Sequence, residues 1–161
     1  SHLITINGSG LNTISGMFCF NNELTSLNVS NNPKLKTLEI LKNKLKDIDI
    51  SKNIELTELN CTWNQLKSLD VTKNTLLEIL SCENNQLTSL NVCNNTKLMS
   101  LFLRSNQLNS NQLNNLFKTL HKNKIWEKTI YIGGNPGAEN CDKSIATKKG
   151  WIVDSEPVEF K

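Results

Sequence analysis

The sequence predicts a repeat solenoid, a single domain in which short coils of chain stack along one axis. Leucine recurs every 21 residues, at Leu24, Leu45, Leu66, Leu87 and Leu108. Asparagine keeps the same spacing in two further series, one running from Asn32 to Asn95 and the other from Asn22 to Asn106. Apolar residues two positions apart recur in every unit, and this spacing puts both side chains on one face of a short strand.

The five units follow one pattern, L-x-x-L-x-L-x-x-N-x-L, in which isoleucine, methionine or cysteine replaces some leucines. They read ISGMFCFNNEL, LKTLEILKNKL, LTELNCTWNQL, LEILSCENNQL and LMSLFLRSNQL. A shorter motif such as LKSLDVTKN separates them. This is the leucine-rich-repeat pattern, and the shorter motif resembles that of a bacterial subclass with 21-residue repeats, the IRREKO type. The resemblance covers residues 14–108. Together they predict a flattened right-handed coil with parallel β-strands on both sides.

Stacking explains why the pattern must repeat. One coil cannot bury its own apolar face, whereas neighbouring coils about 4.8 Å apart bury that face continuously and pair their strands in parallel. The recurrent asparagines stand where the chain leaves a strand and turns. We therefore expect their amide groups to satisfy backbone groups that no strand partner reaches.

The period breaks after Leu108, and residues 109–161 are predicted to form an α/β cap. Apolar residues at helical spacing predict a helix over 110–122, TIYIGGNPG predicts a further strand, and WIVD predicts a last strand after a short helix over 142–149. The segment from IYIGGNPG to KKGW resembles the carboxy-terminal cap of secreted or surface leucine-rich-repeat proteins of anaerobic gut and oral bacteria. Residues 1–13 are interpreted as a tag remnant and a degenerate first coil.

The inward-facing cysteines are predicted to be free thiols. Cys19, Cys61 and Cys82 occupy an inward column. A variant of the IRREKO type, which this sequence resembles, also has cysteine at these positions. Side chains that project in parallel from adjacent strands are poorly directed for a disulfide. Cys93 falls in an outward column, and a total of five is no disulfide framework.

Composition and motifs argue against several classes of function. The formal net charge of +3 comes from scattered lysines, which is weak support for nucleic acid or membrane-surface binding, and no window is apolar enough to span a membrane. The sequence gives no reason to expect a Cys or Ser nucleophile and a carboxylate to meet at His121, as a catalytic triad would require. No paired Cys or His has metal-ligand spacing. Asp49 and Asp70 fall in one outward column, which we interpret as a solvated polar face. The alternative is a weak calcium contact at these two carboxylates. We expect no enzymatic activity and no cofactor.

The strongest functional signal is a set of large side chains predicted to point outward from the first strand of each coil. The second side has almost no large apolar residue in its outward columns. Aromatic anchors on one face are typical of protein interfaces. The candidate contact residues are Phe18, Phe20, Leu41, Trp63, Phe102, Arg104 and Tyr131. The alternative interpretation is that some of them cover one another across adjacent coils and stabilise the sheet.

The sequence thus favours a non-enzymatic module that binds another protein through the concave side of the first sheet. Two alternatives remain open, a rigid spacer within a larger surface protein and carbohydrate binding through exposed aromatics. The family resemblance implies secretion or display at the cell surface, although the chain as given has no signal segment or lipid-attachment cysteine near its start.

Overall fold

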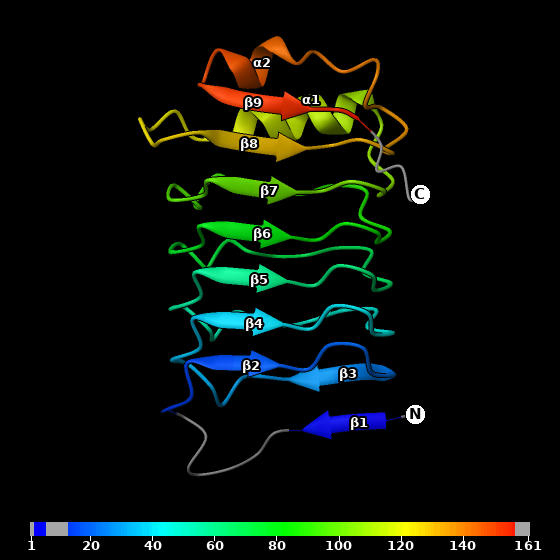
Figure 1. Ribbon diagram of the computed structural model, residues 1–161, viewed down its shortest axis with the longest axis vertical. Coiled ribbons are helices and arrows are strands. Elements are labelled where there is room, and N and C mark those ends of the chain that lie inside the picture. Colours follow the sequence, from blue (N-terminus) through cyan, green and yellow to red (C-terminus); the bar gives the residue numbers. More distant parts are fainter. Residues whose placement is uncertain (1, 6–12, 157–161) are drawn as a thin grey trace.

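The chain forms a stack of coils with one continuous parallel sheet along its length (Figure 1). The computed structural model describes the backbone of residues 2–5 and all of residues 13–156. Ser1 and residues 6–12, which hold part of the predicted tag remnant and most of the predicted first coil, lie outside the described residues. The sheet, called here the first sheet, has the strand order β2 (Gly16–Phe18), β4 (Thr37–Glu39), β5 (Glu58–Asn60), β6 (Ile79–Ser81), β7 (Ser100–Phe102), β8 (Lys128–Tyr131) and β9 (Trp151–Asp154).

The register of the first sheet follows the 21-residue period. Phe18 lies opposite Glu39, and the same line continues through Asn60, Ser81 and Phe102 to Tyr131 in the cap. Each strand buries its middle residue and turns the flanking residues outward, as the two-residue alternation requires. The predicted solenoid is therefore confirmed, with the outward residues in unbroken columns.

The second side of the coils differs from the prediction of parallel strands throughout. There, β3 (Leu24–Asn28) pairs in parallel with β1 (His2–Thr5), but residues 45–50, 66–71 and 87–92 form no strand. The side-chain oxygens of Asn28, Asp49, Asp70 and Asn91 each accept the backbone N–H two residues later, at 2.9 to 3.0 Å. This local bond is common to all four segments. What distinguishes β3 among the described residues is its pairing with β1.

Two ladders of buried asparagines hold successive coils together. Asn64 Nδ2 donates to the carbonyls of Ile40 and Cys61, at 2.9 and 3.0 Å, and its Oδ1 accepts the N–H of Leu45 at 3.0 Å. Asn74 belongs to the second ladder, at the other turn of the coil, where its Nδ2 donates to the carbonyls of Ile50 and Asn53. The pattern repeats at every described coil boundary, which confirms the structural role predicted for these side chains. Asn22 is the exception, because it is exposed and donates to Phe20 O.

The core is a set of stacked apolar columns between the two sides. Leu38, Leu59, Leu80 and Leu101 are fully buried beneath the first sheet, and Cys61 and Cys82 are fully buried in the next column. The two thiols point to the backbone of the following coil, with Cys61 Sγ 3.5 Å from Ser81 O. Burial raises the pKa of Cys61 to about 12, so this thiol behaves as a small apolar side chain. All five cysteines are free, and Cys93 is exposed as predicted.

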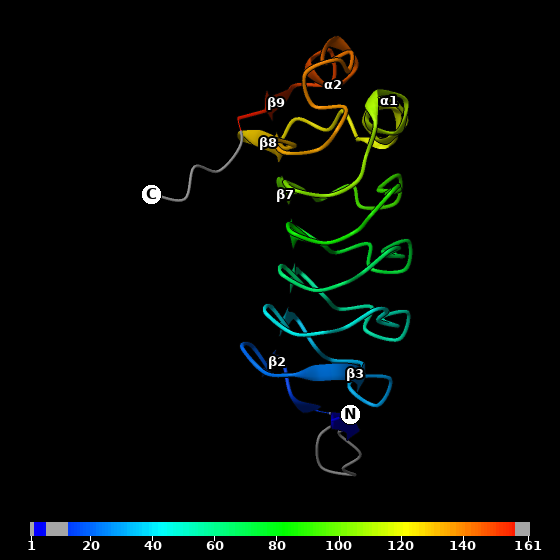
Figure 2. The ribbon, with the colours of Figure 1, turned by 90° about the vertical axis from the view of Figure 1, so that its right-hand side faces the viewer.

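The cap closes the carboxy-terminal end of the core with two helices. Helix α1 (Ser110–Thr119) ends three residues before its predicted limit, and α2 (Ser144–Thr147) is a single turn. The first helix begins with a capping box in which the Asn109 and Gln112 side chains bond each other's backbone N–H. It buries Leu113, Leu116 and Phe117. Figure 2 shows α1 above the second side, while β8 and β9 continue the first sheet.

The local bonds of the second side predict a specific pH dependence of stability. The backbone N–H of Ser51 lowers the pKa of Asp49, and the hydroxyl and N–H of Thr72 lower the pKa of Asp70. A carboxyl whose pKa is lower in the folded state stabilises the fold above its unfolded pKa of about 4, and this stabilisation is lost as the pH falls further.

We expect Asp49→Asn/Asp70→Asn to reduce this loss, because an amide oxygen accepts the same bond without titrating, as Asn28 and Asn91 do. Urea unfolding midpoints at pH 7 and at about pH 3 measure the effect. The variant should match the wild type at pH 7 and exceed it in acid. Equal losses of stability in both proteins would contradict this assignment.

Candidate functional site

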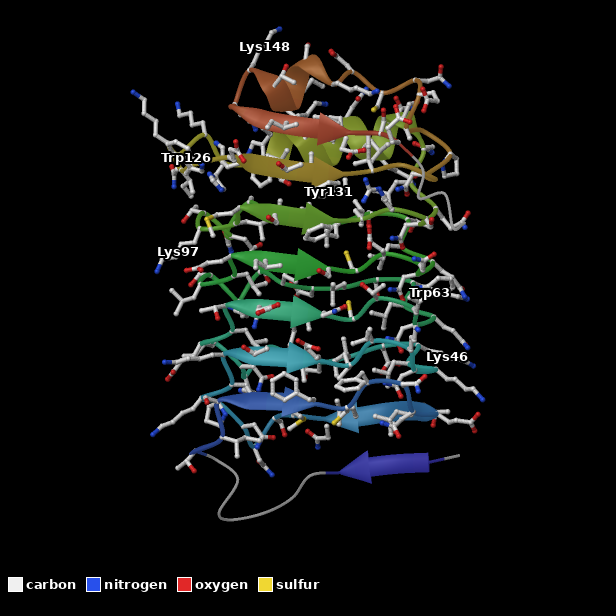
Figure 3. All side chains as sticks on the ribbon, in the orientation of Figure 1. Lys46, Trp63, Lys97, Trp126, Tyr131 and Lys148 are labelled. Atoms are coloured by element: carbon white, nitrogen blue, oxygen red, sulfur yellow. The ribbon has the colours of Figure 1, made fainter. Side chains whose placement is uncertain are left out.

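The outward columns of the first sheet form a surface that we call the first-sheet face, shown toward the viewer in Figure 3. At its amino-terminal end Phe18 is 60% exposed and Phe20 is 53% exposed. Leu41 is partly buried beside them, and Trp63 is 45% exposed two coils along from Phe20. Four of the predicted contact residues therefore lie on one side of the stack, over its first three coils.

Phe18 is held by its own strand although most of its ring is in solvent. Its ring edge lies over Gly16, where a Cβ would come within 3.0 Å of the ring carbon Cε2. A glycine two residues before an aromatic on the same face leaves room for the ring to rest on the backbone. The ring is thus oriented without being buried, as a preformed anchor requires.

Trp63 adopts a backbone conformation that is unfavourable for a large side chain. Its φ is 57°, in the left-handed region, and the corresponding residues of the other coils share this conformation, namely Asn21, Lys42, Asn84 and Ser105. Gly134 takes the same place in the cap, with a φ of 72°. Asparagine and glycine suit this region, whereas a bulky residue pays about 1–2 kcal/mol to enter it. Tryptophan at this position is therefore not explained by the needs of the turn.

The three remaining candidates form one cluster at the junction with the cap. The rings of Phe102 and Tyr131 stack with centroids 4.6 Å apart and planes 2° apart. The guanidinium carbon of Arg104 lies 4.6 Å from the centroid of Tyr131, and Arg104 also pairs with Asp154 at 3.0 Å. These contacts join β7, β8 and β9. These three side chains therefore cover one another across adjacent coils and are only partly exposed.

Glu83 places a half-buried carboxylate between the two groups of aromatics. Burial raises its pKa, and the nearby Arg104 guanidinium partly offsets that effect. The Glu83 and Arg104 side chains approach to 3.6 Å, which is an ion pair but longer than a hydrogen bond. The centre of the first-sheet face is therefore polar, with aromatic groups on either side.

The second side contrasts with this face. In the described repeat coils its outward columns contain Asn, Asp, Ser, Thr and Lys. Cys93 is the exception, in the column two residues after Asn28, Asp49, Asp70 and Asn91. Asp49 and Asp70, considered above for calcium, use their carboxylates to accept local backbone bonds. No group of three or more His, Cys, Asp or Glu side chains in the described part of the chain is arranged to hold a metal ion.

The sequence interpretation missed several exposed apolar residues. Trp126, in the loop before β8, is 87% exposed, more than any other large apolar side chain in the described residues. Ile152 on β9 and Ile54 in a corner turn are also exposed. Trp126 follows Lys124 and Ile125 in a segment without periodicity, so no repeat position indicates where its ring points. Neither described helix has the length and apolar composition needed to cross a bilayer.

Comparison with solved structures places the fold among leucine-rich-repeat proteins. The functional domain of InlJ from Listeria monocytogenes, described as including a cysteine ladder, is 26% identical, with a TM-score of 0.54 over 85% of this chain. An internalin of the same species, InlF, is 25% identical, with a TM-score of 0.63 over 83% of this chain. A Leptospira interrogans leucine-rich-repeat protein, 19% identical over 89% of this chain with a TM-score of 0.51, agrees in fold.

This chain is thus a leucine-rich-repeat solenoid, and the structures that it resembles include several bacterial proteins of that class. It spans 38% of the InlJ chain, 37% of the InlF chain and 49% of the Leptospira chain. No protein-family profile and no curated protein matches the sequence.

Proposed function

We propose that this chain is a non-enzymatic recognition module that binds another protein through its first-sheet face. Phe18, Phe20, Leu41 and Trp63 supply the apolar contact area. Phe102, Tyr131 and Arg104 form a rigid edge beside the cap. The proposal includes secretion or surface display, which the resemblance to the bacterial 21-residue subclass favours, and a role in adhesion.

The observation that carries the proposal is the one-sided distribution of exposed aromatics. Phe18, Phe20 and Trp63 lie on one side of the stack, while the outward columns of the second side are polar. Contiguous exposed apolar groups with a polar surround mark protein interaction sites, and aromatic side chains with few rotatable bonds lose little entropy on binding.

The backbone of Trp63 supports the same conclusion. A residue in a sparsely populated conformation is retained when something other than local stability requires it. At this turn Asn21 and Asn84 show what the backbone accepts without a bulky side chain. Tryptophan is enriched among the residues that dominate binding energies. It occupies this turn only in the coil after Leu41, where it extends the apolar area of Phe20 and Leu41, whereas the other repeat coils have asparagine, lysine or serine there.

The test compares Phe20→Ser/Trp63→Asn with Ile54→Ser, which removes an equally exposed apolar side chain from a corner turn away from the face. Each protein serves as bait, the captured protein is then purified, and its affinity is measured by calorimetry. We expect the face variant to bind at least about 30-fold more weakly, since a truncated anchor residue costs about 2 kcal/mol or more. The Ile54→Ser variant should bind as the wild type does.

The spacer alternative predicts the opposite result. A spacer needs no partner on its sheet faces, so the face variant and the control would capture the same proteins or none. Asparagine at position 63 suits the left-handed backbone, so we expect the Trp63→Asn change by itself to leave the unfolding midpoint unchanged or slightly higher. A large fall in that midpoint would show that Trp63 serves packing. Glycan arrays probed with the same pair of proteins test carbohydrate binding by the face.

A further inference from the structure

A second surface lies beside the cap, at the edge of the first sheet opposite the edge where Trp63 lies. A hollow of about 350 Å³ is lined by residues 122–125, 128, 149 and 150. Four of these are lysines, Lys122, Lys124, Lys128 and Lys149, and we call the hollow the lysine pocket. No aspartate or glutamate lines it. A concave site with one sign of charge focuses the electrostatic potential on a ligand of opposite charge.

Two of the lysines are fixed by the fold. Lys128 is almost fully buried, and its Nζ donates to the carbonyls of Asn123 and Lys149 at 2.8 and 2.7 Å. Lys149 Nζ donates to three carbonyls at the end of α1, those of Phe117, Lys118 and Leu120. The carbonyl end of a helix carries a partial negative charge, which stabilises a cation placed there. Both ammonium groups are therefore held in place at the wall of the pocket.

These cations lack a carboxylate partner within the part of the chain that the structure describes. The ion pairs found there involve Lys44 and Arg104. The excess of positive charge contributes to lowered pKa values of neighbouring groups. Burial lowers the pKa of His121, its bond to Leu98 O opposes this, and the charges of Lys128 and Lys149 make smaller contributions that also lower it. Burial and then Lys122 lower the pKa of Lys149. The carbonyl oxygens that hold Lys128 and Lys149 carry no net charge, so the positive charge of the pocket stays uncompensated and favours an anion.

Trp126 stands in the same loop, between Lys124 and Lys128. Its ring is 87% exposed, and Figure 3 shows it at the edge of the sheet opposite Trp63, on the same side as Lys97. The Asn123 side chain ties this loop to the neighbouring coil through Thr96 O at 3.0 Å. An exposed indole beside a basic pocket offers a flat apolar surface next to the charge.

We propose that the lysine pocket and Trp126 bind an acidic polysaccharide, with a sulfate or phosphate group in the pocket and a sugar ring against the indole. Lysine binds such groups as a point charge, and the hollow has the size of a small-ligand site. The site is separate from the first-sheet face, so neither proposal depends on the other.

The test uses heparin as the acidic polysaccharide and calorimetry at physiological salt. We compare Lys122→Gln/Lys124→Gln with Lys46→Gln/Lys67→Gln, a pair of exposed lysines on the second side (Figure 3 labels Lys46). Both variants lose the same charge. The pocket variant should bind heparin at least about tenfold more weakly, since each lysine near an anionic surface contributes about 1 kcal/mol. The control should stay within about twofold.

Further arms separate specific binding from diffuse attraction. We expect Trp126→Ala to weaken binding of heparin oligosaccharides severalfold while inorganic sulfate binds as before. Equal weakening by both lysine pairs, or no binding of heparin by the wild type, would overturn the proposal. Tighter binding to phosphatidylserine vesicles or to polyglutamate than to heparin would reassign the pocket to a membrane or an acidic peptide. All substituted side chains are exposed, so matching unfolding midpoints are expected and verify the fold.

Discussion

Replacing Asn64 by alanine is expected to lower the free energy of unfolding by about 2–4 kcal/mol, because buried backbone groups lose their partners. The amide of Asn64 serves three of them: the carbonyls of Ile40 and Cys61 and the N–H of Leu45. Alanine leaves the buried N–H of Leu45 without its partner and removes one of the two amide donors from each carbonyl, which keep Asn43 and Asn85 respectively. Since each coil is stabilised by its neighbours, we expect the whole unfolding transition to shift.

The repeat itself provides the control for this prediction. Asn22 holds the same position in its coil but is exposed and donates to Phe20 O, so Asn22→Ala should cost well under half as much. Urea unfolding at pH 7 compares the two variants. Similar losses at the two positions would contradict the ladder as a source of stability.

Asn64→Asp tests the direction of the hydrogen bonds. A carboxylate cannot donate to the carbonyls of Ile40 and Cys61, whereas a protonated carboxyl can donate one bond. Burial should therefore raise the pKa of the new carboxyl above its unfolded value. Stability that depends on the protonated form is present in acid and lost as the pH rises, so the deficit relative to wild type should shrink toward pH 4. A deficit independent of pH would contradict this assignment.

The second large effect is expected for Gly137→Ala, at least about 3 kcal/mol of destabilisation through a backbone clash in the cap. A Cβ on Gly137 would lie 2.1 Å from the backbone nitrogen of Ser110 and 2.2 Å from the carbonyl carbon of Asn109. These atoms open α1 and cannot move as a side chain could. Gly137 N–H also donates to Leu108 O at 2.9 Å, which holds the two segments at this distance.

Gly16→Ala is the matched control, because its new Cβ would approach only the exposed ring of Phe18. Thermal unfolding should show a large shift for Gly137→Ala and a small one for Gly16→Ala. Hydrogen exchange should locate the damage in α1. Equal shifts, or a cap that keeps its protection, would show that the close approach at Gly137 is not a constraint on the fold.

The regular part of the molecule could be predicted because its period leaves little freedom. Once Leu24 and Leu45 fix the repeat, alternation along each strand decides that Cys61 points inward and Phe18 outward. The structure confirms both placements. The contact role assigned to the first-sheet face stays a prediction, because a column of aromatics shows where side chains point and not what they bind.

The irregular part escaped prediction for physical reasons. The cluster of Phe102, Tyr131 and Arg104 depends on Asp154, which a connection longer than the repeat brings alongside. On the second side, only β3 of the described coils forms a strand, by pairing with β1, although its closing side-chain bond recurs in the other coils. The lysine pocket arises where a loop without periodicity meets the end of α1. The left-handed turn at Trp63 had a signal in the sequence, since asparagine and glycine recur in that column.

The measurement that tests the central claim most directly is the affinity of a purified captured partner for the wild type, for Phe20→Ser/Trp63→Asn and for Ile54→Ser. Recognition through the first-sheet face predicts that the face variant loses at least about 30-fold in affinity. It also predicts that Ile54→Ser binds like the wild type and that all three proteins unfold at similar temperatures. Equal affinity of the face variant and the wild type would contradict the claim and leave the sheet as a scaffold without a partner on that face.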